Sequence, residues 1–273
     1  MLNPEQGNNL IKSWIGNNRI FSVSRIGGGE SAVSYEMDKH KKISDVYLNS
    51  LKNNAGFYGE EIDYFVEEYI KGISCADLQV VWDMQGLLKF QDYLFEKYSK
   101  NSIKIHHECV VPFFFDSPWS ESLENKKVLV IHPFRKTIID QYSKRKKLFK
   151  ANVLPDFELK VVAPPQSIAG NKPHSSWKES LEITKEKINE EDFDIALLGC
   201  GSYGLPLVNH IKTNMNKTAI YIGGALQLLF GIKGRRWDDN VSKVNELYND
   251  YWVRPSKEET PANYNLVEGG TYW

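Results

Sequence analysis

Seven short apolar runs, rich in β-branched residues, recur along the chain and alternate with stretches of helical periodicity. The runs cover Phe21–Ser24, Leu78–Trp82, Ile103–Glu108, Val128–Ile131, Leu159–Ala163, Ile195–Leu198 and Ala219–Ile222. This alternation predicts a Rossmann-like α/β fold, with a mostly parallel sheet and helices on both faces. The runs VLVI, IALL and AIYI carry almost no polar residue, so we expect them in the middle of the sheet.

The helical stretches carry their own start signals. Ser176 and Glu179 form an S-x-x-E capping box that precedes apolar residues at helical spacing, which predicts a helix from this point. A second helix is predicted over Thr137–Phe149, with Ile138 and Ile139 facing inward and the KRKK run facing solvent.

The charge balance and the cysteines argue against several classes of protein. The 273 residues include 34 basic and 35 acidic ones, a formal charge of −1, so no overall field attracts nucleic acid. The three cysteines, Cys75, Cys109 and Cys200, are far apart, which argues against a disulfide framework or a zinc site. The start lacks the apolar stretch of a signal peptide, and no run approaches the ~18 apolar residues of a membrane span. We therefore expect a cytoplasmic protein without a transmembrane segment.

We expect residues 1–273 to form a single α/β domain. A polar, proline-containing stretch at 117–127 predicts a weak subdivision, between an N-terminal half, 1–120, and a nucleotide-binding half, 121–273. The segment after Pro255 has little periodicity, but its aromatic residues indicate that it packs against the domain.

The strongest functional pattern is a glycine-rich turn between a buried strand and a helix. Its letters, GCGSYG, comprise Gly199, Cys200, Gly201, Ser202, Tyr203 and Gly204. Glycines let backbone N–H groups approach a phosphate, and a helix N-terminus favours negative charge. A tight turn with a purely structural role is the alternative. The acidic residue of a dinucleotide site and the carboxylate of a methyltransferase site are both missing, which disfavours NAD and S-adenosylmethionine.

The next strand ends in a second glycine turn. It contains Gly223 and Gly224, and Arg235, Arg236 and Trp237 follow it. The carboxyl ends of neighbouring parallel strands lie at one edge of a sheet, where ligands bind. Guanidinium groups there can neutralise a diphosphate, and the tryptophan can stack on a base. A basic helix end with an anchoring tryptophan is the structural alternative.

A third turn, SRIGGGE, joins the first strand to a helix. Gly27, Gly28 and Gly29 lie between Arg25 and Glu30. Consecutive glycines cost folding entropy, so we expect something to approach that backbone closely. A carboxylate at the start of a helix is also commonly no more than compensation for the helix dipole.

Other histidines and cations near strand ends are weaker candidates. The turn after Val128–Ile131 places His132 and Lys136 at the same edge of the sheet, and we interpret His132 as a hydrogen-bonded structural residue rather than a base. The triplet HHE, at 106–108, is not interpreted as a metal site, because neighbours in a strand point to opposite faces. Cys200 is expected to be a small buried residue, although a thiol at a helix start can be activated.

The three glycine turns, in this order, resemble those of bacterial glycosyltransferases of the GT-D fold and of their relatives in surface-polysaccharide loci. The matching stretches are SRIGGGE at 24–30, DIALLGCGSYGLPL at 194–207 and AIYIGGALQLLFGIKGRRW at 219–237. The resemblance implies a GT-D-like fold and a transferase that uses a nucleotide-activated sugar, typically a UDP-hexose. It also implies a saccharide or glycan-linked acceptor and peripheral association with membrane-bound polysaccharide machinery.

The chain departs from that family at one position. The family pattern is R-x-G-D-G-E, and its D-x-E pair is taken to bind a divalent metal, yet the aspartate position here is Gly28. Use of Mn²⁺ or Mg²⁺ is therefore doubtful, and no other cofactor is expected. A metal-independent transferase would hold the leaving diphosphate with the turn at 201–203 and with cations. The candidate cations are Arg25, Lys136, Arg235 and Arg236.

Three hypotheses follow. In the first, a glycosyltransferase uses Glu30 to orient the sugar or to accept the acceptor proton, with Glu268 as a reserve base and Trp237 against the nucleobase. The second is a Rossmann-type enzyme that uses NAD or S-adenosylmethionine. The third is a catalytically silent subunit of a polysaccharide assembly, which the loss of the family aspartate at Gly28 favours.

Overall fold

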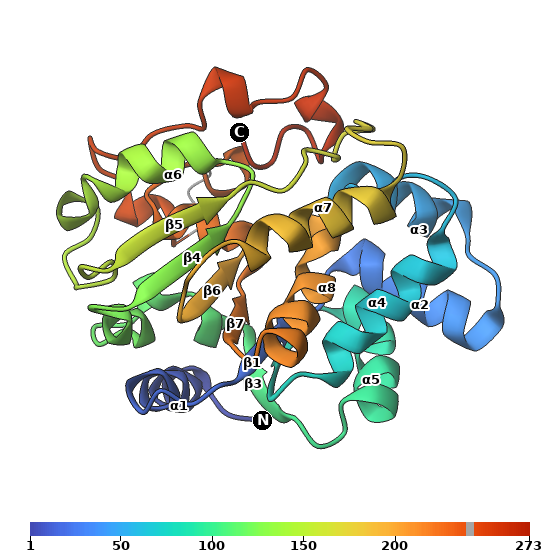
Figure 1. The fold of residues 1–273 in the computed structure, drawn as a ribbon, viewed down its shortest axis with the longest axis horizontal. Coiled ribbons are helices and arrows are strands. Elements are labelled where there is room, and N and C mark those ends of the chain that lie inside the picture. The colour runs from blue at the N-terminus through green and yellow to red at the C-terminus, as the bar shows by residue number, and fades with distance from the viewer. Residues whose placement is uncertain (239–242) are drawn as a thin grey trace.

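The computed structural model describes residues 1–238 and 243–273, and its centre is a seven-stranded sheet. Every strand pair in it is parallel, and the strand order is β3-β2-β1-β7-β6-β4-β5 (Figure 1). The strands are β1 (Ser22–Arg25), β2 (Leu78–Val81), β3 (Ile103–His106), β4 (Lys127–Ile131), β5 (Glu158–Val162), β6 (Ile195–Leu198) and β7 (Thr218–Tyr221). Each coincides with one of the seven predicted runs, so the predicted α/β fold is confirmed.

Nine α-helices accompany the strands within the described residues. They are α1 (Pro4–Gly16), α2 (Gly28–His40), α3 (Asp45–Ser50), α4 (Ile62–Ser74), α5 (Gln85–Tyr98), α6 (Arg135–Tyr142), α7 (Trp177–Asn189), α8 (Gly204–Asn209) and α9 (Leu226–Leu229). A π-helical turn, Leu51–Ala55, continues α3, and short 3₁₀ turns fill many of the connections.

Alternate side chains of β4 enter two separate cores. Val128 and Val130 belong to a cluster that includes residues of α1, α6 and α9, whereas Leu129 and Ile131 belong to one that includes residues of α2, α4, α7 and α8. Because both faces of the strand are covered by helices, neither face can carry polar side chains, which explains the continuous apolar run.

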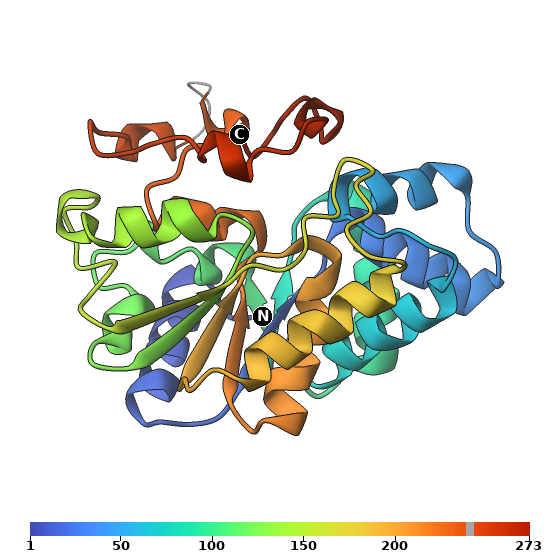
Figure 2. The same ribbon diagram turned by 45° about the horizontal axis from the view of Figure 1, so that its top comes forward.

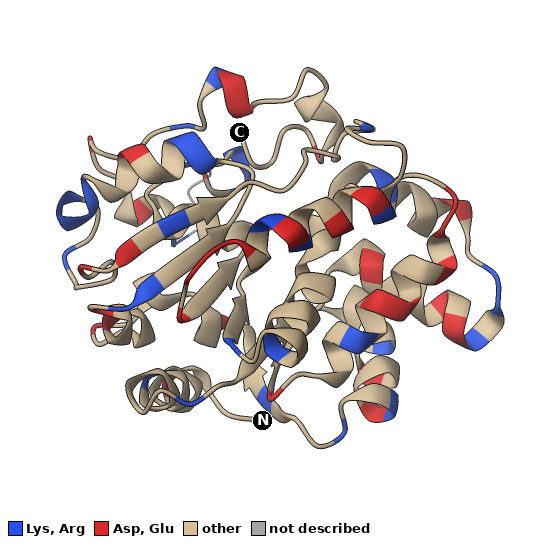
Figure 3. Ribbon diagram, viewed as in Figure 1, with Lys and Arg blue, Asp and Glu red and all other residues tan. Residues whose placement is uncertain are grey.

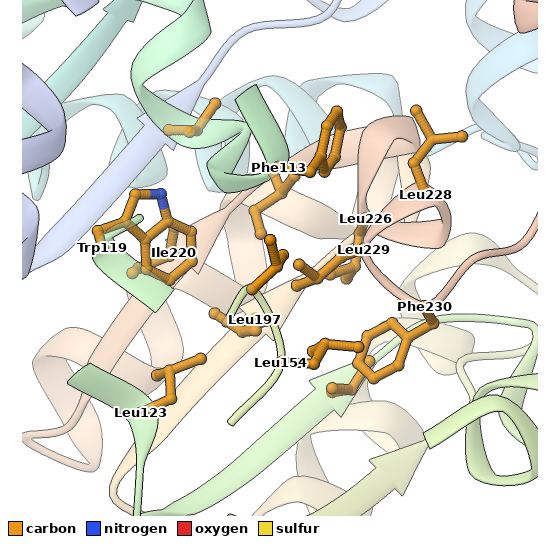
Figure 4. Close-up of a cluster of buried hydrophobic side chains, with 14 of the residues drawn as sticks. Phe113, Trp119, Leu123, Leu154, Leu197, Ile220, Leu226, Leu228, Leu229 and Phe230 are labelled. Atoms are coloured by element: carbon orange, nitrogen blue, oxygen red, sulfur yellow. The ribbon is translucent and has the colours of Figure 1, made fainter. Parts of the chain in front are cut away.

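Residues 117–127 contribute to the first of these cores. Trp119 and Leu123 of this stretch are fully buried and belong to the same cluster as Ile220 of β7 (Figure 4). β1 pairs with β7, so strands from both sides of the stretch form one sheet. The subdivision of the chain at this stretch remains a prediction.

Two details of the predicted helices are wrong. The helix predicted over Thr137–Phe149 ends at Tyr142, and Ile139, predicted to face inward, is 43% exposed. The chain leaves the helix because Leu148 packs in the core and the Tyr142 hydroxyl group accepts a hydrogen bond from the Phe157 N–H at 2.7 Å. These contacts lie outside the helix and have no periodic signal.

The capping box of α7 forms only in part. Ser176 is the N-cap, and its hydroxyl group accepts a hydrogen bond from the Glu179 N–H at 3.2 Å. The Glu179 carboxylate accepts its backbone hydrogen bond from the N–H of Ser175, at 2.8 Å, instead of the N–H of the N-cap residue. The helix therefore begins where it was predicted, with a one-residue shift in the returning bond.

Charged side chains of both signs are mixed over the surface, while the strands carry few of them (Figure 3). This distribution fits the formal charge of −1. No helix in the described part of the chain is long and apolar enough to cross a membrane. The C-terminal segment lies along the molecule on the side of α6, drawn red in Figures 1 and 2.

Candidate functional site

A pocket of about 530 Å³ lies where the carboxyl ends of the strands meet. The turns after β1, β4, β6 and β7 all line it, as does the loop after β5, and the C-terminal segment supplies a further wall. Twelve predicted site residues line the pocket: Arg25, Gly27, Gly28, Gly29, Glu30, His132, Gly199, Gly201, Tyr203, Gly224, Arg236 and Glu268. The structure thus brings together residues as distant in the chain as Arg25 and Glu268, which are 243 positions apart.

Six predicted site residues do not line the pocket. They are Lys136, Ser202, Gly204, Gly223, Arg235 and Trp237. The Lys136 ammonium group pairs with Glu258 at 2.8 Å, and Arg235 donates to the carbonyl oxygen of Gly269 at 2.7 Å. Ser202 is buried and accepts a hydrogen bond from the indole N–H of Trp177 at 2.8 Å.

The predicted base-stacking residue, Trp237, packs behind the pocket wall. The Trp237 ring packs closely against Gly234, because a Cβ atom added to Gly234 would lie 2.7 Å from that ring. The centroid of the Trp237 ring lies 6.4 Å from the centroid of the Tyr272 ring. Tyr272 itself lines the pocket, together with Trp273. Two C-terminal aromatic residues therefore line the pocket, whereas Trp237 does not.

The glycine turns are tight because neighbouring protein atoms fill the space of their missing side chains. A Cβ atom on Gly199 would lie 2.7 Å from the carbonyl oxygen of Gly223, and one on Gly201 would lie 2.6 Å from that of Ala55. Gly201 also has a φ of 57°, which disfavours other residues. At these positions glycine serves the packing of one turn against the next.

The three consecutive glycines of the first turn differ in what surrounds them. A Cβ atom on Gly27 would lie 2.3 Å from a Glu30 carboxylate oxygen, and one on Gly29 would lie 3.1 Å from the Leu51 backbone nitrogen. At Gly28 the nearest contact would be a Leu87 methyl group at 3.5 Å. Of the three, Gly28 is therefore the residue that leaves backbone open to the pocket.

Glu30 is a buried carboxyl group at the start of α2. Its side chain folds back over Gly27, and the residue is only 7% exposed. Burial raises the pKa of Glu30, an effect that its own backbone N–H and the nearby Arg25 oppose and that the Glu268 charge reinforces. The carboxyl groups of Glu30 and Glu268, which are 238 positions apart in the chain, thus interact in one pocket.

Glu268 belongs to the C-terminal segment and has a left-handed backbone, with φ of 47°. Its carboxylate forms an ion pair with Arg236 and accepts a hydrogen bond from the Asn54 side chain at 3.4 Å. This hydrogen bond joins the C-terminal segment to the π-helical turn after α3, and both residues line the pocket. The charge of Arg236 is already compensated by Glu268.

The Cys200 thiol is not activated. Cys200 lines the pocket but is 7% exposed, and burial raises the pKa of its thiol far above the ordinary value. A thiol with a raised pKa stays protonated at neutral pH, and the thiolate is the nucleophilic form. Cys200 is thus the small buried residue that the sequence favoured.

His132 is also a buried residue, and it is neutral. Its Nδ1 atom accepts a hydrogen bond from the Phe134 N–H at 3.1 Å, so the proton of the neutral ring lies on Nε2. Burial lowers the pKa of His132 to about 3. The ring therefore lines the pocket as an uncharged donor, in agreement with its interpretation as a structural residue.

The lowered pKa makes His132 a source of acid sensitivity. The pKa of His132 is about 3 in the folded protein and ~6.5 in the unfolded chain. The neutral ring therefore contributes its full stability above pH ~6.5, and this stability is lost as the pH falls toward 3. The wild-type protein should lose about 2 kcal/mol more unfolding free energy than His132→Asn between pH 7 and pH 5. Urea unfolding at both pH values measures this, and an equal loss in the two proteins would contradict it.

An apolar wall of the pocket was not predicted. It consists of Val46, Tyr47, Met84, Leu87 and Phe90. Val46 is 74% exposed and Met84 is 54% exposed, so apolar surface remains open to solvent at the pocket mouth. Met84 follows β2 at the carboxyl edge and could have been found from its position, whereas the residues of α3 and α5 carry no such signal.

The pocket offers few side chains that could bind a divalent metal. Within residues 1–238 and 243–273 no three His, Cys, Asp or Glu side chains lie together as metal ligands would. The acidic residues that line the pocket are Glu30, which is buried and has a raised pKa, and Glu268, which is engaged with Arg236. Gly28, in the first turn, has no side chain that could bind a metal.

The fold and the pocket define a parallel α/β protein with a pocket at the carboxyl edge of its sheet. No family model matches the chain. No curated protein matches it either. A solved structure described as "The highly conserved domain of unknown function 1792 has a distinct glycosyltransferase fold" is similar, with a TM-score of 0.43 and 17% sequence identity. The similarity covers 81% of this chain and 77% of the other.

Proposed function

We propose that the protein is a glycosyltransferase that takes a sugar from a nucleoside diphosphate sugar and transfers it to a saccharide acceptor. The observation that supports this most is the pocket itself, where glycine turns, the guanidinium group of Arg25 and the carboxyl group of Glu30 converge at the carboxyl edge of a parallel sheet. The sequence resemblance to GT-D enzymes favours a UDP-sugar as donor and a role in surface polysaccharide or glycan synthesis.

The proposed reaction breaks the bond between the anomeric carbon and the diphosphate. The electron pair of that bond leaves with the diphosphate, the acceptor oxygen forms the new bond to the anomeric carbon, and a carboxylate takes the acceptor proton. We assign the role of proton acceptor to Glu30, with Glu268 as the second candidate. In this proposal the saccharide acceptor binds beside the apolar wall that contains Val46, Met84 and Phe90.

Calorimetric titration tests this proposal. UDP, UDP-glucose, NAD and S-adenosylmethionine are titrated separately into the protein, and thermal unfolding is recorded with each. Binding of UDP or UDP-glucose, together with a raised unfolding temperature, is the expected result. Stabilisation by NAD or S-adenosylmethionine alone would favour the Rossmann-type alternative, and no binding by any of these compounds would overturn the proposal.

A further inference from the structure

Arg25 is the last residue of β1 and lines the pocket. Its guanidinium carbon lies 4.6 Å from the centroid of the Trp82 ring, in a cation–π contact. On the other side, a Cβ atom on Gly223 would lie 2.3 Å from its Nη1 atom. The group is therefore held between an aromatic ring and a backbone that only glycine can provide.

The Trp82 ring is itself held from behind. It stacks on the His107 ring, with centroids 4.7 Å apart and an angle of 16° between the planes. Arg25 thus ends β1, while Trp82 and His107 directly follow β2 and β3, the next two strands on one side of β1. Because this stack is built on the sheet, the guanidinium group has a defined position in the pocket.

The donors of Arg25 have no hydrogen-bond acceptor. In the described part of the chain, its guanidinium group takes part in no hydrogen bond and no ion pair, although it lies near Glu30 and lowers the pKa of that carboxyl group. The other guanidinium group that lines the pocket, that of Arg236, is paired with Glu268. A guanidinium group has five N–H donors, and leaving them unpaired in a partly buried place is unfavourable.

We infer that Arg25 binds the diphosphate group of the nucleotide donor directly, and that this binding needs no divalent cation. The inference rests on the proposed function. Two observations carry it: the guanidinium group is positioned but has no hydrogen-bond or ion-pair partner among the described residues, and those residues include no group of three side chains that could hold a metal ion. A planar guanidinium fork matches two phosphate oxygens at once, which a lysine ammonium group does not do.

Titration of UDP into the protein tests the inference, once in EDTA and once in MgCl₂ or MnCl₂. We expect the dissociation constants to agree within about twofold. Arg25→Met should weaken UDP binding by about 10-fold to 100-fold, as expected for loss of a charge-assisted hydrogen bond. Arg25→Lys, which keeps the charge and loses the fork, should fall between Arg25→Met and the wild-type protein.

Arg19 provides a matched control. Its guanidinium carbon lies 3.7 Å from the Trp14 ring centroid, but the residue is exposed and does not line this pocket. Arg19→Met should therefore bind UDP as the wild-type protein does. The comparison of EDTA with metal uses the wild-type protein, so it stands even where Arg25→Met folds poorly.

The outcomes separate this inference from the proposed function. Binding that is lost in EDTA and restored by Mn²⁺ would overturn the inference and leave the glycosyltransferase proposal intact. Unchanged UDP binding by a folded Arg25→Met variant would also overturn the inference and leave the glycosyltransferase proposal intact. Failure of the wild-type protein to bind any nucleotide, with or without metal, would overturn both.

Discussion

Replacing Glu30 by glutamine should slow the release of UDP from a UDP-sugar by about 10²-fold to 10⁴-fold, the range for loss of a general base. Glutamine keeps the shape of the side chain over Gly27 and removes the carboxylate. Initial rates in a coupled assay for UDP, with the wild-type protein and Glu30→Gln at saturating donor, measure the effect.

The pH dependence provides a second measure of the same residue. Because burial raises the pKa of Glu30, the base form is lost at a higher pH than for an exposed glutamate, so the wild-type rate should begin to fall at that higher pH on acidification. The raised pKa also means that folding favours the protonated form. The wild-type protein loses stability as the pH rises through this pKa, and Glu30→Gln should be at least as stable at pH 7.

Glu268→Gln is the control for Glu30→Gln. Glu268 is partly exposed and paired with Arg236, and it interacts electrostatically with Glu30. If Glu30→Gln retains the wild-type rate while Glu268→Gln loses it, the proton acceptor is Glu268. If both retain it, neither carboxylate is the base, and the proposed proton transfer is wrong.

Replacing Trp177 by alanine should lower the free energy of unfolding by about 3–5 kcal/mol, the usual cost of removing a large buried aromatic side chain. Trp177 is fully buried, stacks on Tyr203 with centroids 5.5 Å apart, and contacts Phe65 at 5.2 Å. Its indole N–H donates to the Ser202 hydroxyl group. Urea unfolding at pH 7 measures the loss.

The same residue supports the pocket from behind. Tyr203 lines the pocket, and its hydroxyl group donates to that of Ser167, another lining residue, at 2.9 Å. Trp177→Ala should therefore also weaken UDP binding. Trp177→Phe keeps most of the ring and loses the hydrogen bond, so it should lose only about 1–3 kcal/mol. A loss below about 1 kcal/mol for Trp177→Ala would contradict the role of Trp177 in the core.

The strands could be predicted well because their signal is local. A run such as Ile195–Leu198 is apolar at every position, and only a strand covered on both faces requires this. The order of the strands could not be predicted, because pairing β1 with β7 depends on contacts nearly two hundred residues apart. The end of α6 was missed for the same reason, since Leu148 and Phe157 act on it from outside the helix.

The candidate site, like the fold, could be predicted only in part from the sequence. The glycine turns could be found from the sequence, because glycine next to a strand end is a local pattern, and their common edge follows from a parallel sheet. The sequence did not distinguish Arg25 from Arg235 or Lys136 as an anion-binding group. The structure shows the partners that each cation has among the described residues: Gly269 for Arg235, Glu258 for Lys136, and the Trp82 ring for Arg25.

The amino-acid sequence by itself therefore determined the strands of this protein and the edge of the sheet at which its glycine turns lie, because hydrophobic periodicity and glycine turns act over a few neighbouring residues. Only the tertiary structure decided which side chains enter the pocket. It placed Tyr272 and Trp273 there and Trp237 outside the pocket, and it paired Glu268 with Arg236, while Arg25 has no hydrogen-bond or ion-pair partner among the described residues. These outcomes depend on how distant segments pack, which no local pattern records.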